Sequence, residues 1–477
     1  MLVRTPAKAL LFFVLVPICA CSQIDSSQEV NKLLNLSLEQ LMTMKVVTAA
    51  GYLQPATEAP STITVITKQQ IEERGYDQLE DALRDVPGID MIHINGYAPT
   101  LIYFRGMYGA ENLRALLMID GIVENNILGT NDMAGPAYPL HNIERIEIIW
   151  GPVSALYGEN AFGGVINMIT KKGGDVNGIH ADQSFGSFNT TSERINFGIR
   201  KSNLEYAVAG SLYSTDGPIF SNRDPEYSAS YVDKAYSLNA TISYYTDNSK
   251  STIGYRTYRT PTGFGTYSNS PTVYLGLPPQ GYDNKGVLGI LQRNIDGQRP
   301  NLDDAFLRTI FAEHQYKPND KLNLIGRLVF RETGTGDDSY VYVTIDGRRL
   351  IRTGVATYSS RVLGQLTGNY NLNQNQIISA GLEFYQDNVE QGARRSTLDT
   401  TKVFVLDGRD TVLNLNSTFL PRLYTIRNNF GSYVQFVQKT EWLGKTDFTL
   451  VPGTTEIAIL GTLLVPGLLS LIIPSNP

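Results

Sequence analysis

The glycine-rich stretch of residues 151–174 holds the residue types and spacing that most suggest chemistry, because loops of this kind bind phosphate groups. A phosphate-binding loop needs Lys and then Ser or Thr directly after its glycines, and a helix whose N-terminus faces the phosphate. Here Gly163 and Gly164 are followed by Val165 and an apolar run. The sequence therefore predicts no nucleotide site. We expect the two glycines to let the backbone turn sharply and pack closely against a wall.

Histidine and cysteine offer no metal or catalytic site either. The four histidines are His93, His141, His180 and His314. They lack the close spacing of metal ligands, and no Ser-His-Asp or paired-carboxylate arrangement stands out. The two cysteines, Cys19 and Cys21, lie in an N-terminal signal, so the mature chain has no structural disulfide and no thiolate site. We predict no enzyme activity, no metal and no cofactor.

The composition indicates a β-rich protein. Charged residues make up 18% of the chain, against about 25% in typical soluble domains. Tyr is frequent, with 27 residues against 2 Trp, whereas hydrophobic residues make up only 42%. Many aromatic residues with few charges fit strands on which apolar and small polar residues alternate. The net charge of -6 gives no indication of nucleic-acid binding.

Residues 1–21 are typical of a signal peptide, with a positively charged start and an apolar segment too short to span a bilayer. Cleavage near Ala20 and lipidation of Cys21 are two alternatives that the sequence leaves open. Residues 22–60 are predicted to form a flexible N-terminal segment, because they are polar and contain prolines.

Residues 61–173 are predicted to form a small α+β domain. Thr67 and Gln70 have the spacing of a capping box, which predicts a short helix. Asp77 is expected to cap a second helix that ends before Pro87. The remaining apolar segments are separated by Gly- and Asn-rich turns and are predicted to be short strands: "IDMIHI", "LIYFRG", "ALLMIDG", "IERIEII" and "GVINMIT".

Residues 180–450 show another pattern, in which apolar and small polar residues alternate over segments of about ten residues. In "YSLNATISYY" (residues 236–245), every second residue is apolar or aromatic. Tight polar turns and long loops, such as residues 260–303, join the segments alternately. This is typical of a transmembrane β-barrel, in which every strand must pair because the bilayer offers no hydrogen bonds. A soluble β-sandwich is the alternative, since its strands also alternate.

We expect about eleven such strands up to residue 450, which is an incomplete barrel. Residues 451–477 form an atypical apolar tail in which the alternation stops. A hydrophobic tail is one interpretation. We favour another, that this segment does not continue the barrel, for example after a frameshift. A barrel that stops within its pattern leaves an unpaired strand edge in lipid.

The order of the motifs resembles that of TonB-dependent outer-membrane receptors. "MKVVTAAG" (residues 44–51) is similar to the box that the TonB protein captures by strand addition. "APSTITVITKQQI", "ALRDVPGI", "YFRG", "LLMIDG" and "IERIEIIWGPVSALYGENAFGGVINMITKK" resemble successive landmarks of the plug domain. The resemblance implies a plug at residues 61–173 and a transmembrane β-barrel of which residues 180–450 supply about half of the family's strands.

The resemblance also assigns roles to single residues. The TonB-box stretch is Lys45, Val46, Val47, Thr48 and Ala49. Structural positions of the plug are Arg105, Gly106, Asp120, Gly121, Gly151, Pro152, Tyr157, Gly158, Gly163 and Gly164. Expected ligand contacts at the plug apex are His93, Tyr97 and Tyr108. From the residues alone, we expect Arg105 to form an ion pair and Asp120–Gly121 to form a tight turn.

Two positions depart from the family pattern. Trp150 stands where the family has an arginine that pairs with acidic groups of the barrel wall, so that ion pair is expected to be missing. The last residue is Pro477, whereas the family ends in an aromatic residue.

The implied function is TonB-dependent uptake of a scarce ligand, with a ferric siderophore or similar small-molecule chelate as the best candidate. The implied location is the cell outer membrane, with TonB as a partner at the periplasmic face, lipid around the barrel and no nucleic acid. One alternative is a non-transporting surface receptor or adhesin that uses the barrel as an anchor. Another is a truncated receptor without function.

Overall fold

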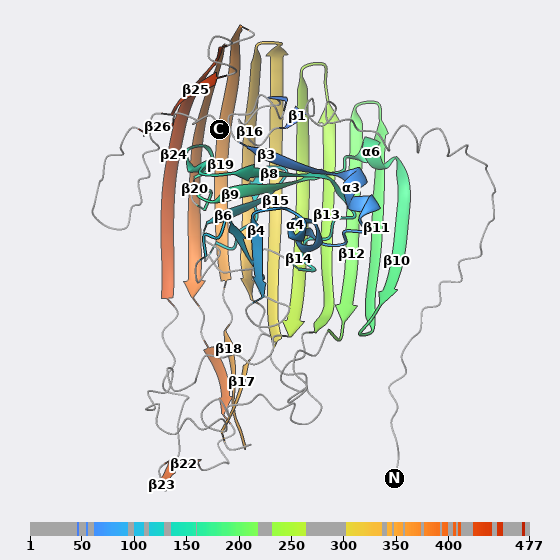
Figure 1. Cartoon of the computed structure of the whole chain (residues 1–477), viewed down its shortest axis with the longest axis vertical. Helices are drawn as coiled ribbons and strands as arrows, with labels where there is room; N and C mark the ends of the chain where they lie inside the picture. The colour runs from blue at the N-terminus through green and yellow to red at the C-terminus, as the bar shows by residue number, and fades with distance from the viewer. Residues whose placement is uncertain are drawn as a thin grey trace, which may run out of the picture.

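The computed structural model consists of a small α+β domain, the plug, which lies against one face of a long antiparallel sheet, the wall (Figure 1). The structure describes residues 45–46, 54–55, 62–93, 100–108, 114–127, 135–158, 160–217, 231–263, 302–335, 341–345, 348–355, 358–373, 376–391, 394–398, 404–406, 409–411, 423–440, 446–451 and 470–472. In the ranges of eight residues or fewer, it describes the backbone alone.

The first plug strand, β3 (Ile63–Thr67), leads directly into helix α3 (Lys68–Glu73). Thr67 Oγ1 accepts a hydrogen bond from the Gln70 amide at 3.2 Å, and Gln70 Oε1 accepts one from the Thr67 amide at 2.9 Å. The predicted capping box is therefore confirmed. It satisfies two of the amides that a helix N-terminus leaves without partners.

The second helix, α4 (Leu79–Arg84), begins one residue later than the sequence predicts. Its N-cap is Gln78, and Asp81 Oδ2 accepts hydrogen bonds from the amides of Asp77 and Gln78, both at 3.1 Å. The expectation that Asp77 caps this helix was wrong. The Asp77 carboxylate turns outward and pairs with Arg194 of the wall, so a charge that could stabilise the helix joins plug and wall instead.

The other plug elements are β4 (Ile89–His93), β5 (Thr100–Phe104), β6 (Ala115–Ile119), β7 (Ile122–Val123), β8 (Ile143–Trp150), α5 (Ser154–Tyr157) and β9 (Gly164–Thr170). The sheet order is β3-β8-β9-β6-β7, with β6 and β9 parallel, while β4 and β5 form a separate pair. All five predicted strand segments are confirmed.

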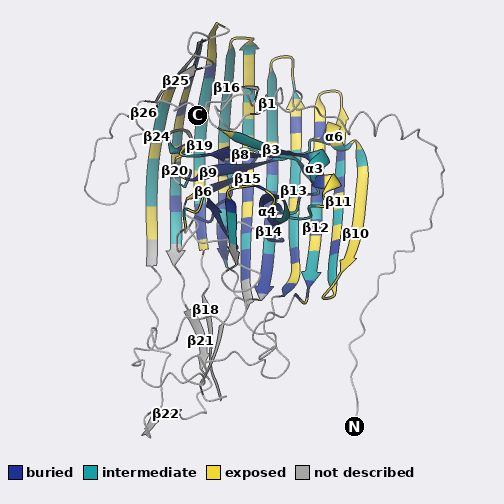
Figure 2. Ribbon diagram, viewed as in Figure 1, coloured by how far each residue is buried: buried dark blue, intermediate teal, exposed yellow. Residues whose placement is uncertain are grey.

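The plug core is made by strands that are apolar on both faces. Leu117, Ile146, Ile148 and Ile166 are fully buried, each with 0% of its surface exposed. A fully buried aliphatic side chain of this size contributes about 1.5–3 kcal/mol. Figure 2 shows this core as the darkest part of the molecule. The plug therefore has its own hydrophobic core, to which Tyr258 and Leu307 of the wall add apolar contacts.

Helix α6 (Gly173–Val176) connects the plug to the wall. The wall strands, in spatial order, are β10 (Gly178–Gly186), β11 (Thr190–Lys201), β12 (Leu204–Thr215), β13 (Val232–Tyr245), β14 (Ser249–Gly263), β15 (Leu302–Asn319), β16 (Leu322–Thr335), β19 (Tyr358–Asn373), β20 (Gln376–Gln391), β24 (Leu423–Thr440), β25 (Thr446–Val451) and β26 (Ser470–Ile472). Eleven of these twelve described strands end by Val451, as the alternation predicts.

Within the described residues the wall does not close, because β10 and β26 are its two edge strands and do not pair with each other. This confirms the expected incomplete barrel sheet. Short turns join the strands at one end, for example between β15 and β16 and between β11 and β12. At the other end lie the small sheets made of β17 (Val341–Ile345), β18 (Arg348–Val355), β21 (Arg394–Leu398), β22 (Phe404–Leu406) and β23 (Arg409–Thr411) (Figure 1).

The two faces of the wall differ as the alternation predicts. On β13, Leu238, Ile242 and Tyr244 are exposed by 37%, 52% and 49%, whereas Ser243 on the other face is buried. Bands of more and less exposed residues are visible along most wall strands in Figure 2, whereas the edge strand β10 is exposed along nearly its whole length. Four exposed tyrosines, Tyr206, Tyr244, Tyr316 and Tyr370, lie near the short turns, where an aromatic girdle meets the membrane interface.

No helix in the described part of the chain is long and apolar enough to cross a membrane.

Candidate functional site

The contact between plug and wall is the part of the structure in which charged residues from distant parts of the chain meet. Its centre is the β6–β7 hairpin, residues 115–127 of the plug. Asp120 and Gly121 have φ angles of 50° and 76° and form the two-residue turn, as predicted. Both angles are positive, as the hairpin turn that suits the twist of two strands requires.

Asp120 is held by the plug's own polar groups. Its carboxylate accepts hydrogen bonds from Thr170 Oγ1 at 2.7 Å, from the Thr170 amide at 3.1 Å and from Lys172 Nζ at 3.1 Å. Burial raises the pKa of Asp120. The charges of Lys172 and Arg256 and the hydrogen bonds from Thr170 outweigh burial and lower that pKa to about 2. The turn therefore keeps a full negative charge at neutral pH.

Three arginines of the wall donate to backbone carbonyls of this hairpin. Arg256 Nη1 donates to Ile119 O at 3.0 Å, and Arg327 Nη1 donates to Gly121 O at 3.0 Å. Arg331 donates to the carbonyl of Val123. Hydrogen bonds from charged donors contribute more than those from neutral ones, typically about 1.5–3 kcal/mol. The wall therefore binds the backbone of the hairpin through these arginines, while the Ile122 side chain packs with Phe311 and Val329 of the wall.

Glu124 adds a buried carboxylate to this contact. Its side chain is 0% exposed, and it faces Arg256 Nη2 at 3.3 Å. Tyr258 donates a hydrogen bond to Glu124 Oε2 at 2.6 Å, and its hydroxyl lies 3.0 Å from that of Tyr138. A buried charge without a partner is costly. The carboxylate of the plug and the guanidinium of the wall each supply the partner that the other needs.

A second contact lies at the N-terminus of α4. The wall's Arg194 pairs with Asp77 of the plug and, at 3.3 Å, with Asp182 of its neighbouring strand. Asn196 Nδ2 donates to His141 O at 3.0 Å. Burial, followed by the charges of Arg194 and Lys171, lowers the pKa of His141 to about 3. The ring is therefore neutral at physiological pH and adds no charge to this contact.

The connection between plug and wall is itself tightly packed. A Cβ at Gly173 would lie 2.1 Å from the carbonyl oxygen of Tyr206, so only glycine fits there. The amide of Gly174 donates to Glu205 Oε1 at 2.9 Å, and Tyr245 donates to Glu205 Oε2 at 2.5 Å. The C-terminal end of the plug is thus fixed to β12 and β13.

A cavity of about 1210 Å³ separates the hairpin from the rest of the wall. Its plug side includes Asn167 and Lys172, and its wall side includes Arg361 and Arg427. Both arginines bind Asp387, with Arg361 Nε at 2.6 Å and Arg427 Nη2 at 2.5 Å from its carboxylate oxygens. Two cations share one carboxylate here, so this part of the wall carries an excess of positive charge. A polar cavity of this size admits water between the two bodies.

Trp150 lies inside the plug and does not replace a plug–wall ion pair. It is 9% exposed, its Nε1 donates to Thr64 Oγ1 at 2.9 Å, and its ring packs edge-to-face on Phe104 at 5.3 Å. The ion pairs of Glu124 and Asp77 with wall arginines join the two bodies instead. The carboxylates therefore come from the plug and the guanidinium groups from the wall.

Arg105 differs from its expected role. It is exposed, has a φ of 48°, and its guanidinium carbon lies 5.5 Å from the centre of the Trp150 ring. The ion pair that we expected is not found among the described residues. A cation–π contact takes its place. Gly106, which follows it, also has a positive φ, of 69°.

The glycines of the opening stretch serve two separate purposes. Gly151 and Gly158 have φ angles of 94° and 73° and form the turns at either end of Pro152–Tyr157. Gly163 and Gly164 have no such angle, but a Cβ at Gly164 would lie 2.5 Å from both Ile149 O and the Phe104 ring. The expected close approach is thus present, although it is made within the plug.

The expected ligand and TonB-box residues are only partly described. Tyr108 is 55% exposed and packs edge-to-face on Tyr103 at 5.1 Å. His93 ends β4, and Tyr97 lies outside the described residues. Lys45 and Val46 form β1 (Lys45–Val46), which pairs with β2 (Gln54–Pro55). Val47, Thr48 and Ala49 lie outside the described residues.

No group of three or more His, Cys, Asp or Glu side chains that could hold a metal ion occurs in the described part of the chain.

Sequence reasoning missed Glu124 and the wall arginines. Glu124 follows an apolar strand in "GIVENN", and Arg256 lies at an inward position of "GYRTYR". Each pattern showed a charge on a face that should be buried, which predicts a partner of opposite charge. The pattern could not show which partner.

Comparison with known proteins supports this architecture. Residues 55–165 match the model of the TonB-dependent receptor plug domain. The chain is 43% identical over 133 residues to an iron-regulated outer membrane virulence protein of Vibrio cholerae, covering 27% of this chain and 20% of that protein. It is 34% identical over 205 residues to the vitamin B12 transporter BtuB of Vibrio vulnificus, covering 42% and 32%. The chain thus spans about a fifth to a third of these relatives.

Solved structures share the fold. The ferric-catecholate import receptor Fiu of E. coli K12 matches with a TM-score of 0.59 at 17% identity, over 88% of this chain and 64% of Fiu. The pyoverdine receptor FpvA of Pseudomonas aeruginosa matches with a TM-score of 0.62 at 15% identity, over 88% and 60%. Residues 55–165 thus match the plug domain of TonB-dependent receptors, and the chain as a whole shares the fold of the solved outer-membrane receptors.

Proposed function

We propose that the chain serves energy-coupled uptake of a scarce ligand across the outer membrane, with TonB as the partner that supplies the energy. A ferric siderophore or similar iron chelate is the proposed ligand. The names of similar proteins support this choice, since they include an iron-regulated outer membrane protein and a ferric-catecholate import receptor. The vitamin B12 transporters among the relatives make a cobalt chelate the next candidate.

The polar contact between plug and wall is the observation that carries the proposal. A ligand passes a plugged barrel only if the plug moves or rearranges. Arginine–carbonyl hydrogen bonds and ion pairs can be exchanged for bonds to water, so opening such a contact costs less net free energy when water reaches the separated groups than when they stay buried. The cavity of about 1210 Å³ beside the hairpin has room for that water. A permanent, purely structural plug would be expected to bury apolar surface across the whole contact, whereas here apolar contacts with the wall occur beside the polar ones, at Tyr258 and Leu307 and around Ile122.

The extended segment at the N-terminal side of the plug supports TonB as the partner. β1 has an extended backbone at Lys45–Val46 and pairs with only two residues, Gln54 and Pro55. A pairing of two residues is weak, because each backbone hydrogen bond adds only about 0.5–1.5 kcal/mol. A partner that adds a strand along residues 45–49 could therefore displace β2.

The proposal places the ligand on the side of the plug away from the short turns, beside the antiparallel pair β4–β5 (Figure 1). Tyr108 is the described residue that supports this placement, since an exposed aromatic ring beside a second tyrosine suits a planar, aromatic chelating group. His93 and Tyr97 are proposed as further contacts; His93 lies at the other end of the pair, where β4 ends and β5 begins.

Deletion of residues 45–50 tests the function. The full chain would be expressed in a strain that lacks its own iron-chelate receptors, and uptake of radioactive iron as a ferric catecholate would be measured with and without a proton uncoupler. We expect uptake that the uncoupler stops and that the deletion abolishes. A deletion of residues 33–38, of equal length in the same N-terminal segment, is the matched control and should leave uptake intact.

Binding to whole cells separates the alternatives. The proposal requires that the deletion abolish uptake while surface binding of the ferric catecholate persists. Binding without any energised uptake in the intact chain would instead support a surface receptor or adhesin. Neither binding nor uptake, with protein present in the outer membrane, would support a receptor without function.

A further inference from the structure

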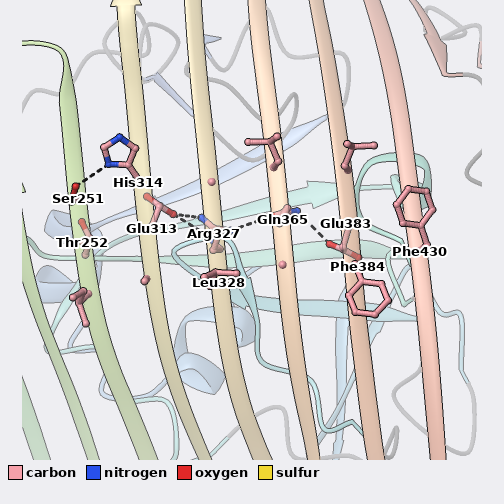
Figure 3. Close-up of a pocket in the computed structure, with 16 residues that line it drawn as sticks. Ser251, Thr252, Glu313, His314, Arg327, Leu328, Gln365, Glu383, Phe384 and Phe430 are labelled. Atoms are coloured by element: carbon pink, nitrogen blue, oxygen red, sulfur yellow. Dashed lines mark hydrogen bonds and ion pairs between the residues drawn. The ribbon is translucent and has the colours of Figure 1, made fainter.

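The outer face of the wall, opposite the plug, contains a depression of about 620 Å³. It extends across β14, β15, β16, β19, β20 and β24, and Figure 3 shows the side chains around it. The residues that matter for the argument are Ser251, His314, Gly326, Leu328, Gly364 and Phe384. The depression lies on the face whose large side chains are apolar and exposed, such as Leu328 at 66% and Phe384 at 50%.

Two glycines make this depression. Gly326 on β16 lies opposite Leu366 on β19. Two residues further along, Leu328 on β16 lies opposite Gly364 on β19. The glycine is thus on β16 in one pair and on β19 in the next. A Cβ at Gly326 would meet nothing within 4 Å, and one at Gly364 would meet only Leu328 Cδ2, at 3.7 Å. No steric conflict therefore requires glycine at either position. Their missing side chains leave a hollow that neighbouring leucines and phenylalanines border.

A polar pair borders the hollow on one side. Ser251 Oγ lies 2.8 Å from His314 Nδ1, on the same face as the exposed leucines (Figure 3). Tyr316, two residues further along β15, is exposed and belongs to the row of tyrosines near the short turns. The hollow is thus apolar in its centre and polar at the side that faces the membrane interface at the short-turn end.

We propose that this depression is a binding site for one glycerophospholipid of the membrane leaflet at the short-turn side. One acyl chain lies in the hollow over Gly326 and Gly364. The phosphate or ester oxygens of the lipid accept a hydrogen bond from the imidazole of His314, whose orientation Ser251 fixes. The proposal depends on the outer-membrane location of the wall and does not depend on uptake.

A lipid fits this surface better than a second copy of the chain. A symmetric dimer would bring the same patch of both copies together, so hollow would face hollow and leave a void. A flexible acyl chain can follow an irregular groove and gain dispersion contacts that a flat strand surface does not offer. The surrounding apolar face is continuous with the hollow and is already the lipid-facing side of the wall.

Photolabelling tests the site. The full chain in liposomes would be labelled with phosphatidylethanolamine that carries a diazirine in one acyl chain, and the labelled residues would be mapped by mass spectrometry. We expect labelling around Gly326–Leu328 and Gly364–Leu366 to exceed that of other lipid-facing segments by about fivefold or more. Excess unlabelled phosphatidylethanolamine should reduce it, whereas inorganic phosphate should not.

Two variants sharpen the test. Gly326→Leu with Gly364→Leu fills the hollow and should remove the excess labelling, whereas Ala240→Leu places a leucine on the same face of the wall, on β13 and away from the hollow, and should not. His314→Leu should abolish the preference for phosphatidylethanolamine over a diacylglycerol probe with the same chain.

Even labelling of the whole apolar face of the unchanged protein would overturn the proposal. So would a stable dimer in which this face is protected from the probe. The first result needs no variant, so the proposal is testable even if the filled variant does not fold.

Discussion

Glu124 of the plug and Arg256 of the wall face each other at 3.3 Å, with 0% and 2% of their side chains exposed. Arg256 also donates to the carbonyl of Ile119, so one guanidinium binds both ends of the β6–β7 hairpin. Because both charges are removed from water, each depends on the other. This pair has the charge arrangement opposite to the one the family resemblance implies, in which the plug supplies the arginine.

Removal of one member of this pair should loosen the plug strongly. Glu124→Gln or Arg256→Met leaves a buried charge without its partner, which typically costs about 3–5 kcal/mol. The double variant should lower the unfolding free energy by less than the sum of the two single variants, because neither charge is then left without its partner. Denaturant unfolding of the plug would be followed by the fluorescence of Trp150, in a Trp442→Phe background that removes the second tryptophan.

The control for this prediction is an exposed ion pair of the plug. Lys68 and Glu72 lie 3.9 Å apart with 40% and 59% of their side chains exposed. Lys68→Met should change the unfolding free energy by less than about 1 kcal/mol. Equal effects of Glu124→Gln and Lys68→Met would show that the buried pair does not hold the plug.

The plug should lose stability as the pH falls, because the Asp120 carboxylate becomes protonated. Its pKa is lowered to about 2, whereas an aspartate in the unfolded chain titrates near 3.9. A lowered pKa stabilises the fold above the unfolded value, and this contribution disappears as the pH falls through the folded one. We expect a loss of about 2–3 kcal/mol between roughly pH 5 and pH 2, which Asp120→Asn should largely remove.

The same Trp150 fluorescence, measured as unfolding curves at a series of pH values, checks this prediction. Glu72→Gln serves as the control, because Glu72 is an exposed carboxylate of the plug. If Asp120→Asn and the unchanged protein lose stability in parallel below pH 5, other carboxylates are responsible.

The sequence predicted the parts of this structure that depend on local periodicity. Alternation along β13 placed Leu238 and Ser243 on opposite faces, because a strand has a period of two residues. The capping box at Thr67 and the Asp120–Gly121 turn were likewise predictable, since each involves residues no more than three positions apart. The resemblance of ordered motifs then supplied the arrangement of plug and wall.

The plug–wall contacts could not be predicted, because they join residues far apart in sequence. Tyr258 and Glu124, for example, are 134 positions apart. The chain contains 40 Lys and Arg, so charge alone does not select Arg256 as the partner of Glu124. Trp150 was interpreted as a missing arginine, and only its contacts with Thr64 and Phe104 show that it belongs to the core.

Gly164 should tolerate no side chain. A Cβ there would lie 2.5 Å from Ile149 O and from the ring of Phe104, which are both in the rigid centre of the plug. Gly164→Ala should therefore cost about 1–3 kcal/mol or more through overpacking. Gly210→Ala on β12 is the matched control, because its nearest neighbour would be Ile195 Cγ2 at 3.5 Å, an ordinary contact. Comparable unfolding curves for the two variants would refute the steric argument.

Replacing Trp150 by the arginine that the family has at this position should destabilise the plug. The ring fills the core between Phe104 and the backbone of Gly88, and its Nε1 donates to Thr64. Trp150→Arg would remove this packing and place a charge at a site that is 9% exposed, so we expect a loss of about 3–5 kcal/mol.

Hydrogen exchange of the amides in β3, β8 and β9, followed by mass spectrometry, measures this loss without the tryptophan signal. Exchange in the most protected amides should accelerate by about a hundredfold or more, since each 1.4 kcal/mol is a factor of ten. Trp150→Phe keeps an aromatic ring but loses the hydrogen bond to Thr64 and part of the packing against Gly88, so its effect should be smaller, about 1–3 kcal/mol. If Trp150→Arg matched Trp150→Phe, the guanidinium would have found a carboxylate, and the family's ion pair with the wall would be restored in this chain.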